Sequence, residues 1–198
     1  MNKIAKVSMA AIGLILALVI ALFVVTSESS LAEKPQSFSD LGGDFTLTSA
    51  SGPVALSDFQ DKVVVLYFGF LTCPEVCPNS MSVIQGALSR LETTQLDSVQ
   101  AVLVSVDPNR DSPQQLAEYT QFYHENLVGL TGSKKQIDAV TRQYGAFYDF
   151  NEIESSTSDY GVEHSSRYYV INPKGALVAA MRHSTTSNEL TAQIQELL

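Results

Sequence analysis

Apolar residues along the chain fall into blocks, and these blocks predict a set of strands. Residues 62–70 form a nearly continuous apolar run rich in β-branched and aromatic side chains, as expected of a central strand covered on both faces. Residues 99–106 form a second run of this kind. Two pairs of short apolar segments, within 45–56 and 168–179, flank turn-forming residues and therefore predict two hairpins.

Other segments show helical spacing of apolar positions. A proline suited to a first helical position and two serine–glutamine capping boxes mark the predicted helix starts. The predicted helices span residues 78–91, 112–123, 133–144 and a segment that starts near Ser187. The stretch between 145 and 168 is polar, and we predict a loop there.

The resulting order is hairpin, strand, helix, strand, helix, helix, hairpin, helix. A strand–helix–strand unit followed by an antiparallel hairpin and a helix is typical of the thioredoxin-like arrangement, an α/β fold in which helices flank a mixed sheet. The chain has 198 residues, 45% of them hydrophobic and 17% charged, which is enough for one well-packed domain. We assign this domain to residues 41–198.

The N-terminal residues predict a membrane anchor. Residues 7–25 carry no charge and are long enough to cross a bilayer as a helix. Lysines precede this run and glutamates follow it, so the positive-inside rule keeps the N-terminus cytoplasmic. We expect residues 1–25 to be a single-pass transmembrane helix in a bacterial cytoplasmic membrane, followed by a flexible linker over 26–40, with the soluble domain in the periplasm or outside. The alternative is a signal peptide cleaved after Ser30–Ala32.

The formal charge of −9 argues against a nucleic acid or an anionic lipid surface as a partner. A cationic ligand or a basic protein patch would suit it, although acidity of this kind often serves solubility alone.

Both cysteines of the chain lie directly after the first apolar strand, at Cys73 and Cys77. Two thiols at this spacing can close a disulfide, exchange with another disulfide or hold a soft metal such as Cu(I). A bridge across four residues would remove little unfolded-state entropy, so an inert stabilising disulfide is the weaker interpretation. If Pro78 begins the helix, Cys77 is its N-cap, and the helix dipole should lower the pKa of the thiol.

His164 is the candidate third ligand. It precedes the strand of the second hairpin, and in a thioredoxin-like sheet this loop approaches the cysteine loop. Two thiolates and an imidazole suit copper, and they would also suit Zn(II), which normally takes a fourth ligand. The other two histidines, His124 and His183, follow a helix and the last strand.

The chain resembles the Sco/SenC family through motifs that occur in the family's order. These are Cys73–Pro78 (CPEVCP), residues 105–113 (SVDPNRDSP), 129–132 (GLTG), and 159–165 (DYGVEHS) with 172–175 (NPKG). The resemblance extends from about Phe45 to the C-terminus. Two departures are mild, because Glu75 and Glu163 stand where the family usually has aspartate and both keep the charge.

The resemblance implies a membrane-anchored, thioredoxin-like copper protein needed to assemble cytochrome c oxidase. It implies that Cys73, Cys77 and His164 are the copper ligands. It also implies that the partner is the CuA domain of oxidase subunit II, with a periplasmic copper donor upstream. Asp107 becomes a candidate outer-shell or partner-contact residue, whereas local signals explain Asp107 and Asp111 equally well as turn and helix-start residues.

Three functions are compatible with these residues. The first is a copper metallochaperone that serves the CuA site. The second is a thiol-disulfide oxidoreductase that uses Cys73 and Cys77 as a redox pair to reduce the cysteines of the apo-CuA site. Because such a reductase needs no third ligand, His164 favours metal binding. The third is a thiol peroxidase, for which Thr72 and Arg167 are present but no recognisable peroxidase motif is.

Overall fold

The structure, a computed structural model, describes residues 40–152 and 160–198. Within these ranges, no helix has the length and apolar character needed to cross a bilayer. The predicted anchor over residues 7–25 lies outside the described residues, as does the predicted linker up to residue 39.

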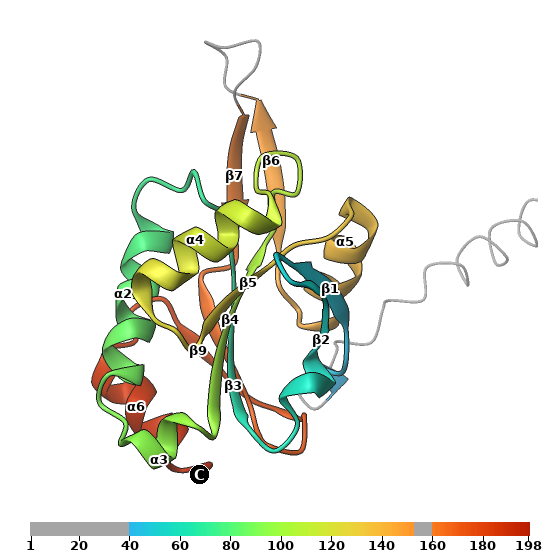
Figure 1. The fold of residues 1–198 in the computed structure, drawn as a ribbon. Helices are drawn as coiled ribbons and strands as arrows, with labels where there is room; N and C mark the ends of the chain where they lie inside the picture. The colour runs from blue at the N-terminus through green and yellow to red at the C-terminus, as the bar shows by residue number, and fades with distance from the viewer. Residues whose placement is uncertain (1–39, 153–159) are drawn as a thin grey trace, which may run out of the picture. The chain divides into compact units, whose positions relative to one another are not determined.

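A five-stranded mixed sheet organises the domain (Figure 1). Its strand order is β5-β4-β3-β8-β9, in which β3, β4 and β5 are parallel and the β8–β9 hairpin is antiparallel to β3. The strands of this sheet are β3 (Val63–Gly69), β4 (Val99–Ser105), β5 (Leu127–Leu130), β8 (Arg167–Ile171) and β9 (Leu177–Arg182). Two separate hairpins are β1 (Thr46–Ser49) with β2 (Gly52–Ala55) and β6 (Tyr148–Glu152) with β7 (Tyr160–His164).

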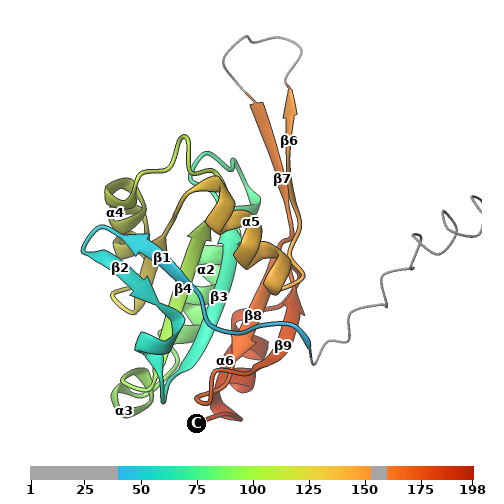
Figure 2. The ribbon, with the colours of Figure 1, turned by 90° about the vertical axis from the view of Figure 1, so that its right-hand side faces the viewer.

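Helices cover both faces of this sheet, with α2 and α6 on one side and α5 on the other (Figures 1 and 2). The α-helices are α2 (Val76–Leu88), α3 (Thr93–Leu96), α4 (Pro113–Tyr123), α5 (Lys134–Gln143) and α6 (Ser187–Gln195), and a 3-10 helix, η2, spans Leu56–Phe59. The predicted capping boxes at Ser112 and Ser133 are both formed. The thioredoxin-like arrangement predicted from the order of elements is therefore confirmed.

Strand β3 is central because its sequence is apolar on both faces. All seven of its residues are buried, and it pairs with β4 on one side and β8 on the other. The ring of Phe68 in β3 packs against the rings of Tyr144 and Tyr169, and the centroids of the three rings lie 5.5 to 6.1 Å apart. Strand β3 ends at Gly69, and the cysteine loop begins there.

One prediction about secondary structure was wrong, and one strand was missed. The polar stretch predicted as a loop contains the β6–β7 hairpin, which projects beyond the end of the sheet (Figure 1). Strand β5 was not predicted, because its four residues are too few to show a pattern.

Helix α2 begins at Val76 instead of Pro78 and ends at Leu88 instead of Leu91. Proline is tolerated at its third position, because the first backbone N–H groups of a helix have no intrahelical acceptor. Cys77 is consequently the second residue of α2, and Glu75 occupies the N-cap.

Candidate metal centre

The cysteine loop connects the end of β3 to the start of α2. The Cys77 backbone N–H donates to the Cys73 sulfur across 3.3 Å, so the first thiol of the pair caps the helix that carries the second. Both cysteines are free thiols and both are buried, with Cys73 8% and Cys77 1% exposed. Cys77 approaches the backbone of β3 closely at Gly69, where a Cβ atom would lie 2.9 Å from the Cys77 sulfur. A residue without a side chain is needed there for the thiol to keep its position.

Asp111 holds the same loop from the neighbouring strand connection. Its Oδ2 atom accepts the Leu71 backbone N–H at 3.0 Å and the Ser105 hydroxyl at 2.6 Å. The carboxyl is 2% exposed, and burial raises its pKa while the bonds from Ser105 and Leu71 act in the opposite direction. Asp107 is also buried and forms an ion pair with Arg110. Asp111 thus has a structural contact to the cysteine loop beyond the turn chemistry that its sequence context indicates.

His164 is the last residue of β7, at the base of the projecting hairpin, and not in a loop as predicted. Its Nε2 atom lies 3.4 Å from the Cys77 sulfur. Its Nδ1 atom lies 3.3 Å from the carbonyl oxygen of Ser165, which assigns the proton to Nδ1 and leaves the Nε2 lone pair facing the thiol. Burial lowers the pKa of His164, although the backbone of Ser165 opposes this shift. The lowered pKa favours the neutral imidazole, which is the form that binds a metal.

The structure brings together the three residues that the sequence analysis singled out. The sulfur atoms of Cys73 and Cys77 and a ring nitrogen of His164 all lie within 4.8 Å of one another. Across the residues that the structure describes, this is the single group of three or more histidine, cysteine or acidic residues placed to hold a metal ion. The other histidines lie elsewhere: His124 accepts the Asn126 backbone N–H at 3.0 Å, and His183 is exposed.

The expected acidification of Cys77 by the helix dipole is wrong in direction. Burial raises the pKa of this thiol well above its ordinary value, and the neighbouring Cys73 raises it further. The Phe70 backbone N–H and the Tyr67 hydroxyl lower it, but by less than burial raises it. Cys77 lies inside the first turn of α2 and is buried, and desolvation disfavours the charged thiolate.

The remaining candidate residues lie at the surface. Thr72 is exposed in the cysteine loop, and Arg167 is exposed at the start of β8, where it pairs in register with Arg182. Glu75 and Glu163, the two departures from the family pattern, are also exposed. None of these four contributes to the buried metal-ligand group.

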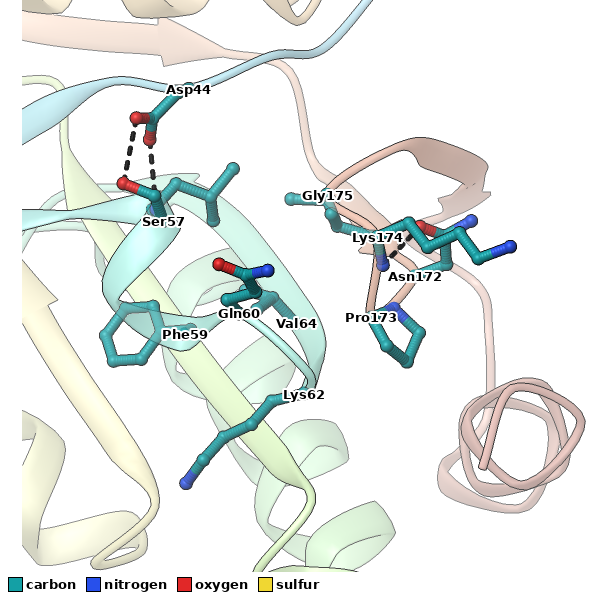
Figure 3. Close-up of a pocket in the computed structure, with 12 residues that line it drawn as sticks. Asp44, Ser57, Phe59, Gln60, Lys62, Val64, Asn172, Pro173, Lys174 and Gly175 are labelled. Carbon is teal, nitrogen blue, oxygen red and sulfur yellow. Dashed lines mark hydrogen bonds between the residues drawn. The ribbon is translucent and has the colours of Figure 1, made fainter.

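A pocket of about 330 Å³ lies near the opposite end of β3 from the cysteine loop (Figure 3). The carboxylate of Asp44 on its rim already accepts both the backbone N–H and the hydroxyl of Ser57. The side chains of Lys62 and Lys174 point in different directions (Figure 3). This pocket has no convergent set of reactive groups, so the candidate site is the cysteine–histidine group.

Three contributors to the site were missed from the sequence. Gly69 interrupts an apolar strand pattern, and a glycine in that setting is a known signal for close approach of another group. Tyr67 lies 6.0 Å from His164 between ring centroids, and Phe70 lies 5.5 Å from it, both in edge-on contact. No pattern in the sequence separates these aromatic residues from ordinary core residues.

Comparison with known proteins identifies relatives of the chain. The SCO1/SenC family model matches residues 33–198. Protein sco1 of Schizosaccharomyces pombe is 32% identical over 156 residues, which cover 78% of this chain and 59% of that protein. The chain thus spans about three fifths of the length of that relative.

Two solved structures are also similar. Apo Sco1 of Thermus thermophilus shares 33% identity at a TM-score of 0.75, covering 83% of this chain and 95% of that one. Copper-bound ScoI of Arabidopsis thaliana shares 34% identity at a TM-score of 0.72, covering 79% and 96%. Together with the family match over most of the domain, these likenesses show that the chain belongs to the SCO1/SenC family.

Proposed function

We propose that the domain binds one copper ion through Cys73, Cys77 and His164. The observation that carries this proposal is the convergence of two buried sulfur atoms and one imidazole nitrogen within 4.8 Å. Three donors bound to one ion at about 2.0–2.3 Å lie about 3.5–4 Å apart in a trigonal arrangement. The three residues therefore need to close by only about 1 Å to bind copper.

The donor set favours copper over harder metals. Two thiolates are soft ligands, and Cu(I) accepts the low coordination number that three protein donors provide, whereas Zn(II) normally takes a fourth ligand. The copper-bound structure of the Arabidopsis relative supports the same choice. Copper here is cargo, and the function is that of a metallochaperone that delivers it to the CuA site of cytochrome c oxidase subunit II after receiving it from a periplasmic donor. The family membership supports this role.

Anaerobic copper titration of the reduced domain, from residue 33 onward, tests the proposal. We expect one copper per domain and, for Cu(II), a sulfur-to-copper charge-transfer band, because thiolate is the strongest electron donor present. His164→Ala should weaken binding and change this band. His183→Ala is the matched control, since His183 is exposed and should leave both unchanged. Wild-type affinity and spectrum in His164→Ala would refute the ligand assignment.

A second function, reduction of the cysteines of the apo-CuA site, has one observation in its favour. The two free thiols are close to each other, and the Cys73 sulfur accepts the backbone N–H of Cys77. His164→Ala separates the two functions because it removes a metal ligand and spares the dithiol. If delivery is the main role, this variant should reduce a test disulfide in vitro but fail to restore oxidase in cells at limiting copper. Full restoration there would favour the reductase.

Membrane attachment through residues 7–25 belongs to the same proposal. An uncharged run of this length supports an uncleaved anchor with the domain outside. Mass spectrometry of the membrane-extracted protein should find this segment still attached. A mature protein that begins at Glu33 would mean that the segment is a cleaved signal instead.

A further inference from the structure

The hydroxyl of Tyr67 is a buried polar group beside the candidate metal centre. Tyr67 lies in β3, two residues before Gly69, and its side chain is 0% exposed. No hydrogen bond of ordinary geometry joins its hydroxyl to a residue that the structure describes, but the hydroxyl lies close enough to Cys77 to lower the pKa of that thiol. Buried tyrosine hydroxyls normally have a partner, so this one requires an explanation.

The side chains of Tyr67 and Cys77 converge on the same point of the backbone. A Cβ atom built at Gly69 would lie 2.9 Å from the Cys77 sulfur and 3.1 Å from Cε1 of Tyr67, the ring carbon next to the one that carries the hydroxyl. The Tyr67 ring also contacts the His164 ring edge-on at 6.0 Å. The phenol is thus adjacent to two of the three proposed ligands.

The chemistry of the sulfur makes Cys77 a stronger partner for this hydroxyl once a metal ion is bound. A protonated thiol is a weak hydrogen-bond acceptor, whereas a thiolate accepts a strong, charge-assisted bond. Metal binding requires the thiolate, so the acceptor strengthens when the ion arrives. Tyrosine is protonated at neutral pH, and burial raises the pKa of Tyr67 further, so the hydroxyl is available to donate.

We propose that Tyr67 is a positioning residue that donates its hydroxyl hydrogen to the Cys77 sulfur when copper is bound. The inference rests on the proposed function, because it assigns a role toward the same ion. Hydrogen bonds to a ligating sulfur withdraw electron density and tune both metal affinity and the energy of the sulfur-to-metal transition. Tyr67 would supply this bond from the side of β3, where solvent has no access.

Two other buried hydroxyls compete as partners of Tyr67 and provide the controls. Ser80 and Tyr168 are both buried, and their hydroxyls also lack a well-oriented bond within the described part of the chain. Tyr168 lies opposite Tyr67 in the β3–β8 register, with ring centroids 5.6 Å apart. Tyr168→Phe therefore removes the same atom from an equally buried neighbouring tyrosine, and Ser80→Ala removes the other possible partner.

The test compares Tyr67→Phe, Tyr168→Phe and Ser80→Ala with the wild-type protein after anaerobic copper loading. We expect Tyr67→Phe to move the Cu(II) charge-transfer band to lower energy, because a sulfur without this bond gives up its electron more easily. We also expect an apparent affinity about tenfold weaker, the usual size of an effect from a group that supports a ligand. Both controls should keep the wild-type band and affinity, and thermal unfolding of the metal-free variants checks that each is folded.

A second measurement needs no substitution. In the Cu(I)-loaded wild-type protein, NMR should show a slowly exchanging Tyr67 hydroxyl proton with a cross-peak to the Cys77 β-hydrogens. An unchanged band and affinity in Tyr67→Phe, equal changes in Tyr168→Phe or Ser80→Ala, or absence of the cross-peak would each overturn the role of Tyr67. Failure of the wild-type protein to load copper would overturn this role together with the proposed function, so the two failures are distinguishable.

Discussion

Substitution of Gly69 by alanine tests whether the metal centre depends on the close approach between α2 and β3. The added Cβ would lie 2.9 Å from the Cys77 sulfur, 3.1 Å from Cε1 of Tyr67 and 3.3 Å from Cδ1 of Leu103. Ordinary contacts of a Cβ atom begin near 3.4 Å, so the sulfur must move by at least about 0.5 Å. Cys77 is 1% exposed and is held in the first turn of α2, so this movement must displace the helix or rotate the thiol.

Displacement of α2 and rotation of the Cys77 thiol should each affect copper binding more than they affect folding. Overpacking of a buried site costs about 1–3 kcal/mol of unfolding free energy. A ligand displaced by about 0.5 Å is at the limit that a metal site tolerates. We therefore expect Gly69→Ala to remain folded at room temperature and to bind copper at least about tenfold more weakly.

The assay measures copper affinity by competition with a chelator and stability by urea unfolding of the metal-free protein. Gly132→Ala is the matched control, because its Cβ would meet Cδ2 of Leu47 at the same 2.9 Å but lies outside the metal centre. It should lose a similar amount of stability and keep wild-type copper affinity. Wild-type affinity in a folded Gly69→Ala protein would refute the argument that the absence of a side chain at this position places the thiol.

Two further predictions concern the loop and the redox state of the cysteines. Asp111→Ala should lower the free energy of unfolding by about 1–3 kcal/mol in urea, because the Leu71 N–H and the Ser105 hydroxyl lose their acceptor. Burial raises the pKa of Asp111 in the folded state. The free energy of unfolding of the wild-type protein, relative to Asp111→Asn, should therefore fall as the pH rises from below 3.8 through the folded-state pKa. Parallel pH profiles of the two proteins would contradict this. Complete formation of the Cys73–Cys77 disulfide should abolish stoichiometric copper binding, because both thiolates are consumed; copper retained after verified oxidation would rule out the ligand set.

The fold and the convergence of Cys73, Cys77 and His164 were predictable because they depend on strong local signals. The continuous apolar run that became β3, the capping boxes of α4 and α5, and the position of the cysteines at a strand end all follow from short segments of sequence. The placement of His164 beside Cys77 was expected from the topology of the sheet, and the structure places them 3.4 Å apart. The sequence motif did not indicate that the His164 ring lies at the base of the β6–β7 hairpin, because the polar composition of this segment favoured a loop.

The wrong predictions have a common cause, because each depends on the tertiary surroundings of a residue in the folded protein. The thiol pKa was expected to follow the helix terminus, but the direction depends on how much solvent the fold removes, which no local pattern encodes. Similarly, the alternation of Tyr148-Asp-Phe150 has the period of a strand, yet its polar composition favoured a loop until pairing with β7 was known. The contact of Tyr67 with His164 and the bond of Asp111 to Leu71 join residues 97 and 40 positions apart in the chain.

The unequal burial of the three proposed ligands bears on how copper would leave the site. Cys77 lies deepest, with β3 behind it, while Cys73 is slightly exposed and His164 is half-buried. Cys73 and His164 are therefore the proposed ligands more open to an incoming thiolate. The two cysteines share one loop that is fixed by Asp111 and by the contact at Gly69, whereas His164 belongs to the separate β6–β7 hairpin. Exchange of His164 for a ligand of the acceptor thus leaves the cysteine loop intact. A carrier that must both hold and release copper needs this difference between two ligands on a fixed loop and one on a separate hairpin.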